Sequence, residues 1–161
     1  MSPPGHLFVL TARPDWHDRY VPTVDLMDET FVVATPEAVA AALHDPQLWT
    51  SWWPDLALVV DKDRGLKGLH FSVSGPLVGT GELWLEPFAD GVIVHVFLRA
   101  DPTRPGSRTE PTTLPIRAVW REARRRAWQT KRGMGLLKDR LEGGRAAGEP
   151  RPDLAQPIPG V

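Results

Sequence analysis

Between residues 56 and 101 the chain consists of four β-rich runs joined by very short connections. The connections carry the turn signals Arg64-Gly65, Gly75-Pro76 and Asp90-Gly91. Parallel strands need a crossover of a dozen residues or more, so connections this short indicate antiparallel neighbours. The segment therefore predicts an antiparallel meander with strands over residues 56–63, 68–75, 78–88 and 92–101.

A strand and two short helices are expected before the meander. Residues 24–35 end in β-branched and aromatic residues, which predicts a strand. Thr35 suits a helix N-cap and Pro36 suits the first helical turn, so a helix is predicted over residues 36–44. A second short helix is predicted over residues 47–53.

A long helix is expected after the meander, over residues 115–142. It begins at Pro115 and ends at Gly143. Its apolar and small residues recur at alternating spacings of four and three, which predicts one stripe facing the sheet: Ile116, Trp120, Ala123, Ala127, Thr130, Met134, Leu137 and Leu141. The basic residues of the run 121–126 (REARRR) are then expected on the outer side.

The length of 161 residues fits one domain, expected over residues 24–142. Residues 1–23 are expected to form a partly ordered N-terminal extension and residues 143–161 a disordered tail. No apolar run has the length of a membrane span, and the first residues lack the pattern of a signal peptide. A cytoplasmic location is therefore expected.

Three segments carry a resemblance to a known family. DETFVVATPEAVAAALHDPQLWTSWWPDL (28–56), GTGELWLEP (79–87) and GVIVHVFLRAD (91–101) resemble the START-like polyketide cyclase and lipid-transport superfamily, also called SRPBCC. The resemblance covers about residues 24–142. It implies an α+β helix-grip fold, in which a curved antiparallel sheet wraps around a long C-terminal helix.

Family members usually have seven strands, whereas five are predicted here. Either the sheet has fewer than seven strands, or residues 6–11 or 102–114 supply a further one.

The helix-grip fold implies an apolar cavity between the sheet and the helix. Ala123, Ala127 and Thr130 are small enough to leave room there. The alternative is a solid core, filled by large sheet side chains such as Trp84 and Phe97. If the cavity is open, the predicted ligand contacts also include His70, Trp84, Phe97 and Trp53. The alternative for Trp53 is a structural role, in which it and its neighbours Trp49 and Trp52 anchor the helix pair to the sheet.

Residues two apart on a strand share a face, which places His95, Phe97 and Arg99 together. If this face lines the cavity, His95 is the best candidate for a general acid or base and Arg99 for polarising a carbonyl. Asp28 or Glu29 would then supply a carboxylate to orient a histidine or pair with Arg99. If the face points to solvent, these are ordinary exterior residues.

Other kinds of site are disfavoured. The chain has no Cys, which excludes disulfides and thiol nucleophiles, and its five His show no metal-ligand spacing. No metal or other cofactor is expected, and a net charge of −1 disfavours a sequence-specific nucleic-acid binder. Residues 117–142, however, carry nine Lys or Arg against three acids, a basic balance that suits peripheral contact with an anionic membrane.

Three functions follow as hypotheses. The first is binding of a hydrophobic or aromatic small molecule, such as a lipid, a quinone or a polyketide-like compound, in the cavity beneath the C-terminal helix. The second is a polyketide cyclase or dehydratase that uses His95 and Arg99. The third is an interaction module that docks through its basic C-terminal helix, and the oligomeric state stays open.

Overall fold

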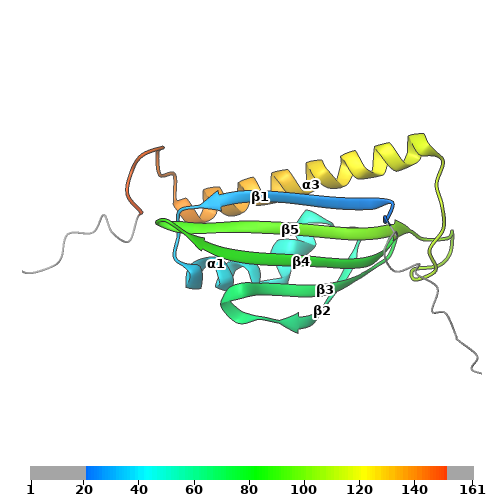
Figure 1. Cartoon of the computed structure of the whole chain (residues 1–161), viewed down its shortest axis with the longest axis horizontal. Helices are drawn as coiled ribbons and strands as arrows, with labels where there is room; N and C mark the ends of the chain where they lie inside the picture. Colours follow the sequence, from blue (N-terminus) through cyan, green and yellow to red (C-terminus); the bar gives the residue numbers. More distant parts are fainter. Residues whose placement is uncertain (1–20, 152–161) are drawn as a thin grey trace, which may run out of the picture.

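The computed structural model describes residues 21–151, and Figure 1 shows one curved sheet with a long helix running beside it. The elements, in chain order, are β1 (Val24–Val32), α1 (Pro36–Leu43), α2 (Pro46–Trp52), β2 (Ala57–Asp63), the 3₁₀ turn η2 (Gly65–Lys67), β3 (Gly68–Ser74), β4 (Leu77–Phe88), β5 (Gly91–Pro102) and α3 (Ile116–Glu142). The predicted α+β class, the antiparallel sheet and the long C-terminal helix are confirmed.

The five strands are ordered β1-β5-β4-β3-β2, and every neighbouring pair is antiparallel. The meander supplies four of them, and β1 joins its last strand by pairing Val24 with Ala100 and Val32 with Val92. Among the described residues the loop after β5 adds only an isolated bridge between Thr103 and Pro111. Residues 6–11, the other segment considered for a further strand, lie outside the described residues.

The helix boundaries follow local chemistry. The Thr35 hydroxyl accepts a hydrogen bond from the Ala38 N–H at 3.2 Å, which caps α1. The Asp45 carboxylate accepts one from the Gln47 N–H at 3.0 Å and caps α2. α3 ends where Gly143 takes a left-handed conformation, with φ 59°, and donates its N–H to the Asp139 carbonyl.

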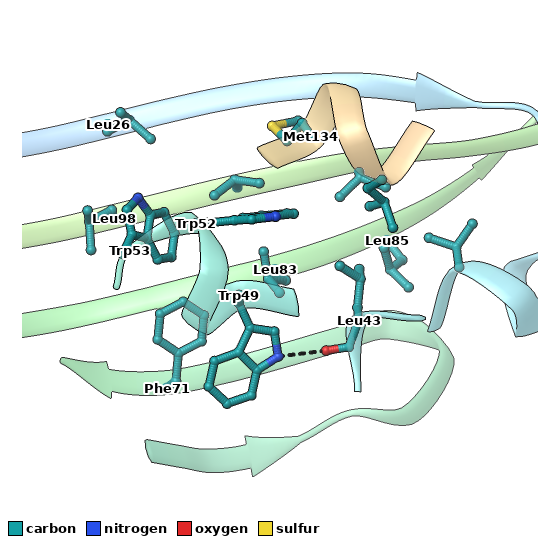
Figure 2. Packing of buried hydrophobic residues seen from close by; sticks show 14 of the residues in the cluster. Leu26, Leu43, Trp49, Trp52, Trp53, Phe71, Leu83, Leu85, Leu98 and Met134 are labelled. Atoms are coloured by element: carbon teal, nitrogen blue, oxygen red, sulfur yellow. Dashed lines mark hydrogen bonds between the residues drawn. The ribbon is translucent and has the colours of Figure 1, made fainter. Parts of the chain in front are cut away.

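The core lies on the aliphatic face of the sheet, under α1, α2 and part of α3 (Figure 2). Tryptophans of α2 and its C-cap fill its centre. Trp49 stacks on Phe71 at 6.2 Å between ring centroids and donates its indole N–H to the Leu43 carbonyl at 2.8 Å. Trp52 and Trp53 meet edge to face at 6.0 Å. The tryptophans of α2 therefore anchor the helix pair to the sheet.

α3 is buried along only part of its length. From Arg126 onward it buries one side, whereas no residue from Ile116 to Arg125 is buried. The prediction that one stripe faces the sheet over the whole helix is therefore wrong at Ile116, Trp120 and Ala127, all of which are exposed. The reason is that α3 packs mainly on the edge strand β1 and on α2, so its first turns have no sheet beneath them.

The expected charged face is also corrected at Arg126, whose side chain is fully buried. Its guanidinium forms two hydrogen bonds of 2.7 Å with the Asp55 carboxylate and one of 2.7 Å with Glu122. A bidentate pair of this kind satisfies the fork of the guanidinium, and it joins α3 to the chain after α2.

The end of α3 is held by a buried acid, Glu142. Glu142 accepts hydrogen bonds from the Val33 N–H at 2.8 Å and from Lys138 Nζ at 2.7 Å. Burial alone would raise the pKa of Glu142, but these two donors hold it below its usual value. Together with the Arg126 pair, this contact fixes the buried half of α3 at both ends.

Among the described residues, no helix has the length and apolar character that crossing a membrane requires.

Candidate functional site

The mixed face of β5 points away from the core. Val96 and Leu98 are fully buried on the aliphatic side, so His95, Phe97 and Arg99 lie on the opposite, outer face of the sheet. Of the two alternatives considered for this face, the structure therefore has the exterior one, and these side chains do not line the space beneath α3. The physical reason is that an all-aliphatic face adds no polar strand side chain to the core that packs against the tryptophans of α2.

The outer face nevertheless brings several predicted residues together. A shallow groove of about 300 Å³ crosses β3, β4 and β5, and we call it the sheet groove. Four of the residues predicted as ligand contacts or catalytic groups line it: His70, Trp84, Phe97 and Arg99. Glu82, Thr80 and Gly81 complete it.

His95 lies beside the sheet groove, where two carboxylates and two aromatic rings contact its imidazole. Its Nε2 is 3.0 Å from a Glu86 oxygen, and its Nδ1 is 3.4 Å from a Glu29 oxygen. The imidazole stacks on Trp84 at 4.5 Å between centroids and faces Phe97 at 6.4 Å. Glu29 is one of the two acids predicted to orient a histidine, whereas Glu86 was not singled out, although it shares a face with Trp84.

The other polar residues around the sheet groove are paired as well. His70 Nδ1 is 2.5 Å from Asp61 Oδ1, and this hydrogen bond lowers the pKa of Asp61. Arg99 Nε is 3.4 Å from Asp25, and Glu82 pairs with Arg64. The groove therefore carries mixed charges, each already matched by a neighbour.

The residues predicted beneath α3 are scattered. Thr130 and Trp53 are fully buried, Ala123 is half-buried and Ala127 is exposed. Three residues after Thr130, the Trp52 indole lies directly against the α3 backbone at Gly133, so this part of the space beneath the helix is filled. The side chains expected to fill a solid core, Trp84 and Phe97, lie on the other face of the sheet.

A second hollow lies between the end of the sheet, the loop after β5 and the exposed half of α3. It measures about 530 Å³, and we call it the end pocket. Its apolar lining includes Leu77 of β4, Pro102 of β5 and Leu114 of the loop before α3. Ser107, Arg108 and Glu122 supply polar groups.

The loop that walls the end pocket is fixed by backbone hydrogen bonds. The Gly75 N–H donates to the Arg108 carbonyl at 3.1 Å, and the Thr103 N–H donates to the Pro76 carbonyl at 3.0 Å. Sequence reasoning missed this pocket because residues 102–115 show only that a loop is present.

Within residues 21–151, no group of three or more His, Asp or Glu is arranged to hold a metal ion.

No family model matches the chain, and no curated protein matches it. Among solved structures it is similar to the Aha1 dimer from Colwellia psychrerythraea, at 17% identity and a TM-score of 0.48, over 76% of this chain and 99% of that one. It is also similar to the di-domain ARO/CYC StfQ of the steffimycin biosynthetic pathway, at 15% identity and a TM-score of 0.44, over 71% of this chain and 50% of that one.

A START superfamily protein from Mycobacterium smegmatis is similar at 11% identity and a TM-score of 0.41, over 73% of this chain and 98% of that one. All three identities are low and all three TM-scores lie below 0.5. The likeness is therefore one of general architecture, and it says nothing about a ligand or a reaction.

Proposed function

We propose that the protein binds a hydrophobic or aromatic small molecule in the end pocket, between the sheet and α3. The observation that carries this proposal is the pocket itself. Its volume of about 530 Å³ is in the range of sites for small organic ligands, which are mostly apolar with a few polar groups. A lipid chain, a quinone or a polyketide-like compound fits that description.

The polar groups of the end pocket differ in how firmly they are held. Glu122 is fixed by its hydrogen bond to the buried Arg126, so its carboxylate is a rigid acceptor. Arg108 and Ser107 come from the loop and supply donors. Donors and an acceptor around an apolar floor favour a ligand that carries a carbonyl or hydroxyl group on an apolar body.

The test is native mass spectrometry of the full chain, purified from its own source or a close host. We expect a mass excess that disappears under denaturing conditions. The variant Leu114→Trp should fill the pocket and lose the bound molecule. Leu66→Trp is the matched control, because Leu66 is half exposed on η2 and lines neither the end pocket nor the sheet groove.

Two results would count against the end pocket. One is the absence of any adduct together with no thermal stabilisation by a panel of lipids, quinones and aromatic polyketides. The other is a bound molecule that Leu114→Trp retains as well as Leu66→Trp does, while circular dichroism shows both variants folded.

A second proposal is catalysis at the sheet groove, with His95 as acid or base and Arg99 polarising a carbonyl. The contact between His95 Nε2 and Glu86 favours it, because a carboxylate commonly orients a catalytic imidazole. The Glu29 contact at Nδ1 counts against it, since neither ring nitrogen is then free. If His95 acts on an aromatic polyketide, His95→Ala should lower turnover by roughly 10²–10⁴. Unchanged turnover would end that role.

A further inference from the structure

The exposed half of α3 carries large aromatic side chains on its solvent side. Trp120 and Trp128 are each 71% exposed, and Ile116 is 66% exposed. Apolar residues scattered singly over a surface are ordinary, but two exposed indoles on one helix are not. They are eight residues apart, which is about 12 Å along the helix axis.

Basic residues surround the two indoles. We define the basic-aromatic face of α3 as its exposed residues Arg117, Trp120, Arg121, Arg124, Trp128 and Arg132. An open hollow between the two indoles is lined in part by Arg121, Arg124 and Ala123. Cations and aromatic rings therefore share one continuous surface.

Within residues 21–151, the arginines of this face have no acidic partner. Among residues 116–132 the only acid is Glu122, which is half-buried and bonded to Arg126. Other cations of this stretch are used, since Arg125 pairs with Asp55 and Lys131 with Asp28. The four arginines of the face form no ion pair within the described part of the chain.

We propose that the basic-aromatic face docks on the surface of an anionic lipid bilayer, with α3 lying parallel to the membrane plane. An interfacial helix combines arginines, which attract anionic headgroups, with tryptophans, which settle at headgroup depth. Both indoles are exposed on the same helix, so they can reach the interface together. The buried half of α3 stays on the sheet, and this holds the docking half in place.

The composition of the face selects a bilayer over a protein partner. A partner protein would need acids placed opposite each arginine, whereas a headgroup layer offers negative charge at every position along the helix. Single-stranded nucleic acid is the nearest rival, because bases also stack on exposed indoles among arginines. It is therefore included as an arm of the test.

The experiment is vesicle flotation of the full chain. Vesicles of phosphatidylcholine alone are compared with vesicles that also contain phosphatidylglycerol, each at low and high salt. We expect binding to the anionic vesicles only, weakened by salt as the charges are screened. Brominated phosphatidylcholine, added to the anionic vesicles, should quench part of the tryptophan fluorescence.

Two double variants separate charge from the aromatic contribution. Arg121→Gln with Arg124→Gln should weaken binding about thirtyfold, or roughly 2 kcal/mol, since each basic residue near an anionic surface contributes ~1 kcal/mol. Trp120→Ala with Trp128→Ala should weaken it by about tenfold or more and abolish the fluorescence quenching. The control for the arginine variant is Lys62→Gln with Lys67→Gln, and the control for the tryptophan variant is Phe88→Ala. All three control residues are exposed on other elements.

Three results would overturn the proposal. The first is no flotation with anionic vesicles at low salt. The second is flotation that the α3 variants and the control variants lose equally. The third is binding of polyuridylic acid that is tighter than binding to the vesicles and is lost in the same α3 variants, which would assign the face to nucleic acid.

Discussion

Gly133 is the residue at which the Trp52 indole touches the backbone of α3. A Cβ atom at this position would lie 2.3 Å from the ring, so the ring and the helix cannot both stay in place. We expect Gly133→Ala to destabilise the fold by about 1–3 kcal/mol, the usual cost of overpacking a core. Urea unfolding followed by tryptophan fluorescence measures this change.

Gly135 supplies the matched control, because a Cβ there has nothing within 4 Å. Gly135→Ala should raise the free energy of unfolding by up to about 1 kcal/mol, since alanine is the better helix former. Equal effects of the two substitutions would show that helix propensity, and not the Trp52 contact, governs this part of α3.

The ion pair between Arg126 and Asp55 makes a second prediction at this scale. Asp55→Ala should cost roughly 3 kcal/mol at neutral pH, because it leaves a fully buried guanidinium with fewer partners. The Arg126 hydrogen bonds hold the pKa of Asp55 below its usual 3.8. The stabilisation is therefore present above that value and is lost as pH falls through the lower folded pKa.

Denaturant unfolding of wild type and Asp55→Ala across that pH range tests this dependence. The two proteins should converge in stability at low pH. Glu110→Ala is the control, since Glu110 and Arg104 form an exposed pair that is worth at most about 1 kcal/mol. A difference between wild type and Asp55→Ala that persists in acid would refute the ion-pair explanation.

At the residue scale, sequence reasoning identified which side chains share a face but not where that face points. Strand parity correctly groups His95, Phe97 and Arg99, because alternation is a property of the strand itself. The side of the sheet that α2 covers depends on how the tryptophans pack, which is tertiary information. For the same reason, Arg126 could not be distinguished from its exposed basic neighbours.

At the scale of elements, His44 links the C-cap of α1 to the end of β2. Its Nε2 is 2.9 Å from Asp63 Oδ1, and this hydrogen bond is the main cause that raises the pKa of His44 above 6.5. The link therefore stabilises the fold fully below the unfolded pKa and is lost as pH rises through the higher folded value. NMR titration of the His44 ring measures this pKa directly.

Asp63→Asn should return the His44 pKa toward 6.5, because the amide carries no charge. Asp45→Asn is a suitable control, since the Asp45 carboxylate caps α2 through Gln47, whereas the His44 ring bonds to Ala40 and Asp63. If the His44 pKa were the same in wild type and Asp63→Asn, the Asp63 charge would make no contribution to the link between α1 and β2.

Element boundaries were the most predictable level of this structure. Caps and turn residues such as Thr35-Pro36 and Asp90-Gly91 act locally, so the predicted strands and helices form where their patterns indicated. The stripe of α3 was misread along its first turns. Spacing shows which residues share a helix face, but it does not show how far the partner surface extends.

At the scale of the whole molecule, β2 is an edge strand of the sheet. Val59 and Val60 are exposed on it, and a register irregularity follows Val60. Lys62 is also exposed there, and a charged residue on an edge discourages pairing with another chain. We expect Lys62→Val to raise self-association above the wild-type level, measured as molar mass by light scattering over a concentration series.

The control for this edge is Lys67→Val, which changes an exposed lysine on η2 instead of β2. It should leave the concentration dependence as in wild type. If both variants associate equally, general surface hydrophobicity is responsible and the edge is not.

The general architecture could be predicted because short connections and one long helix leave few arrangements. The end pocket could not be, since it is formed by β4, β5, the loop before α3 and α3 itself, which are brought together only by folding. The local pattern of residues 102–115 does not indicate that these four segments come together.

The division of α3 at Arg126 also has a dynamic consequence. Amide protons exchange with solvent when a helix opens locally, and opening is easiest where few side chains are buried. Residues 117–125 should therefore exchange quickly, whereas the amides near Thr130 and Leu137 should exchange only when the sheet itself comes apart. Deuterium uptake along α3 would then fall in a single step at Arg126, where the buried half of the helix begins.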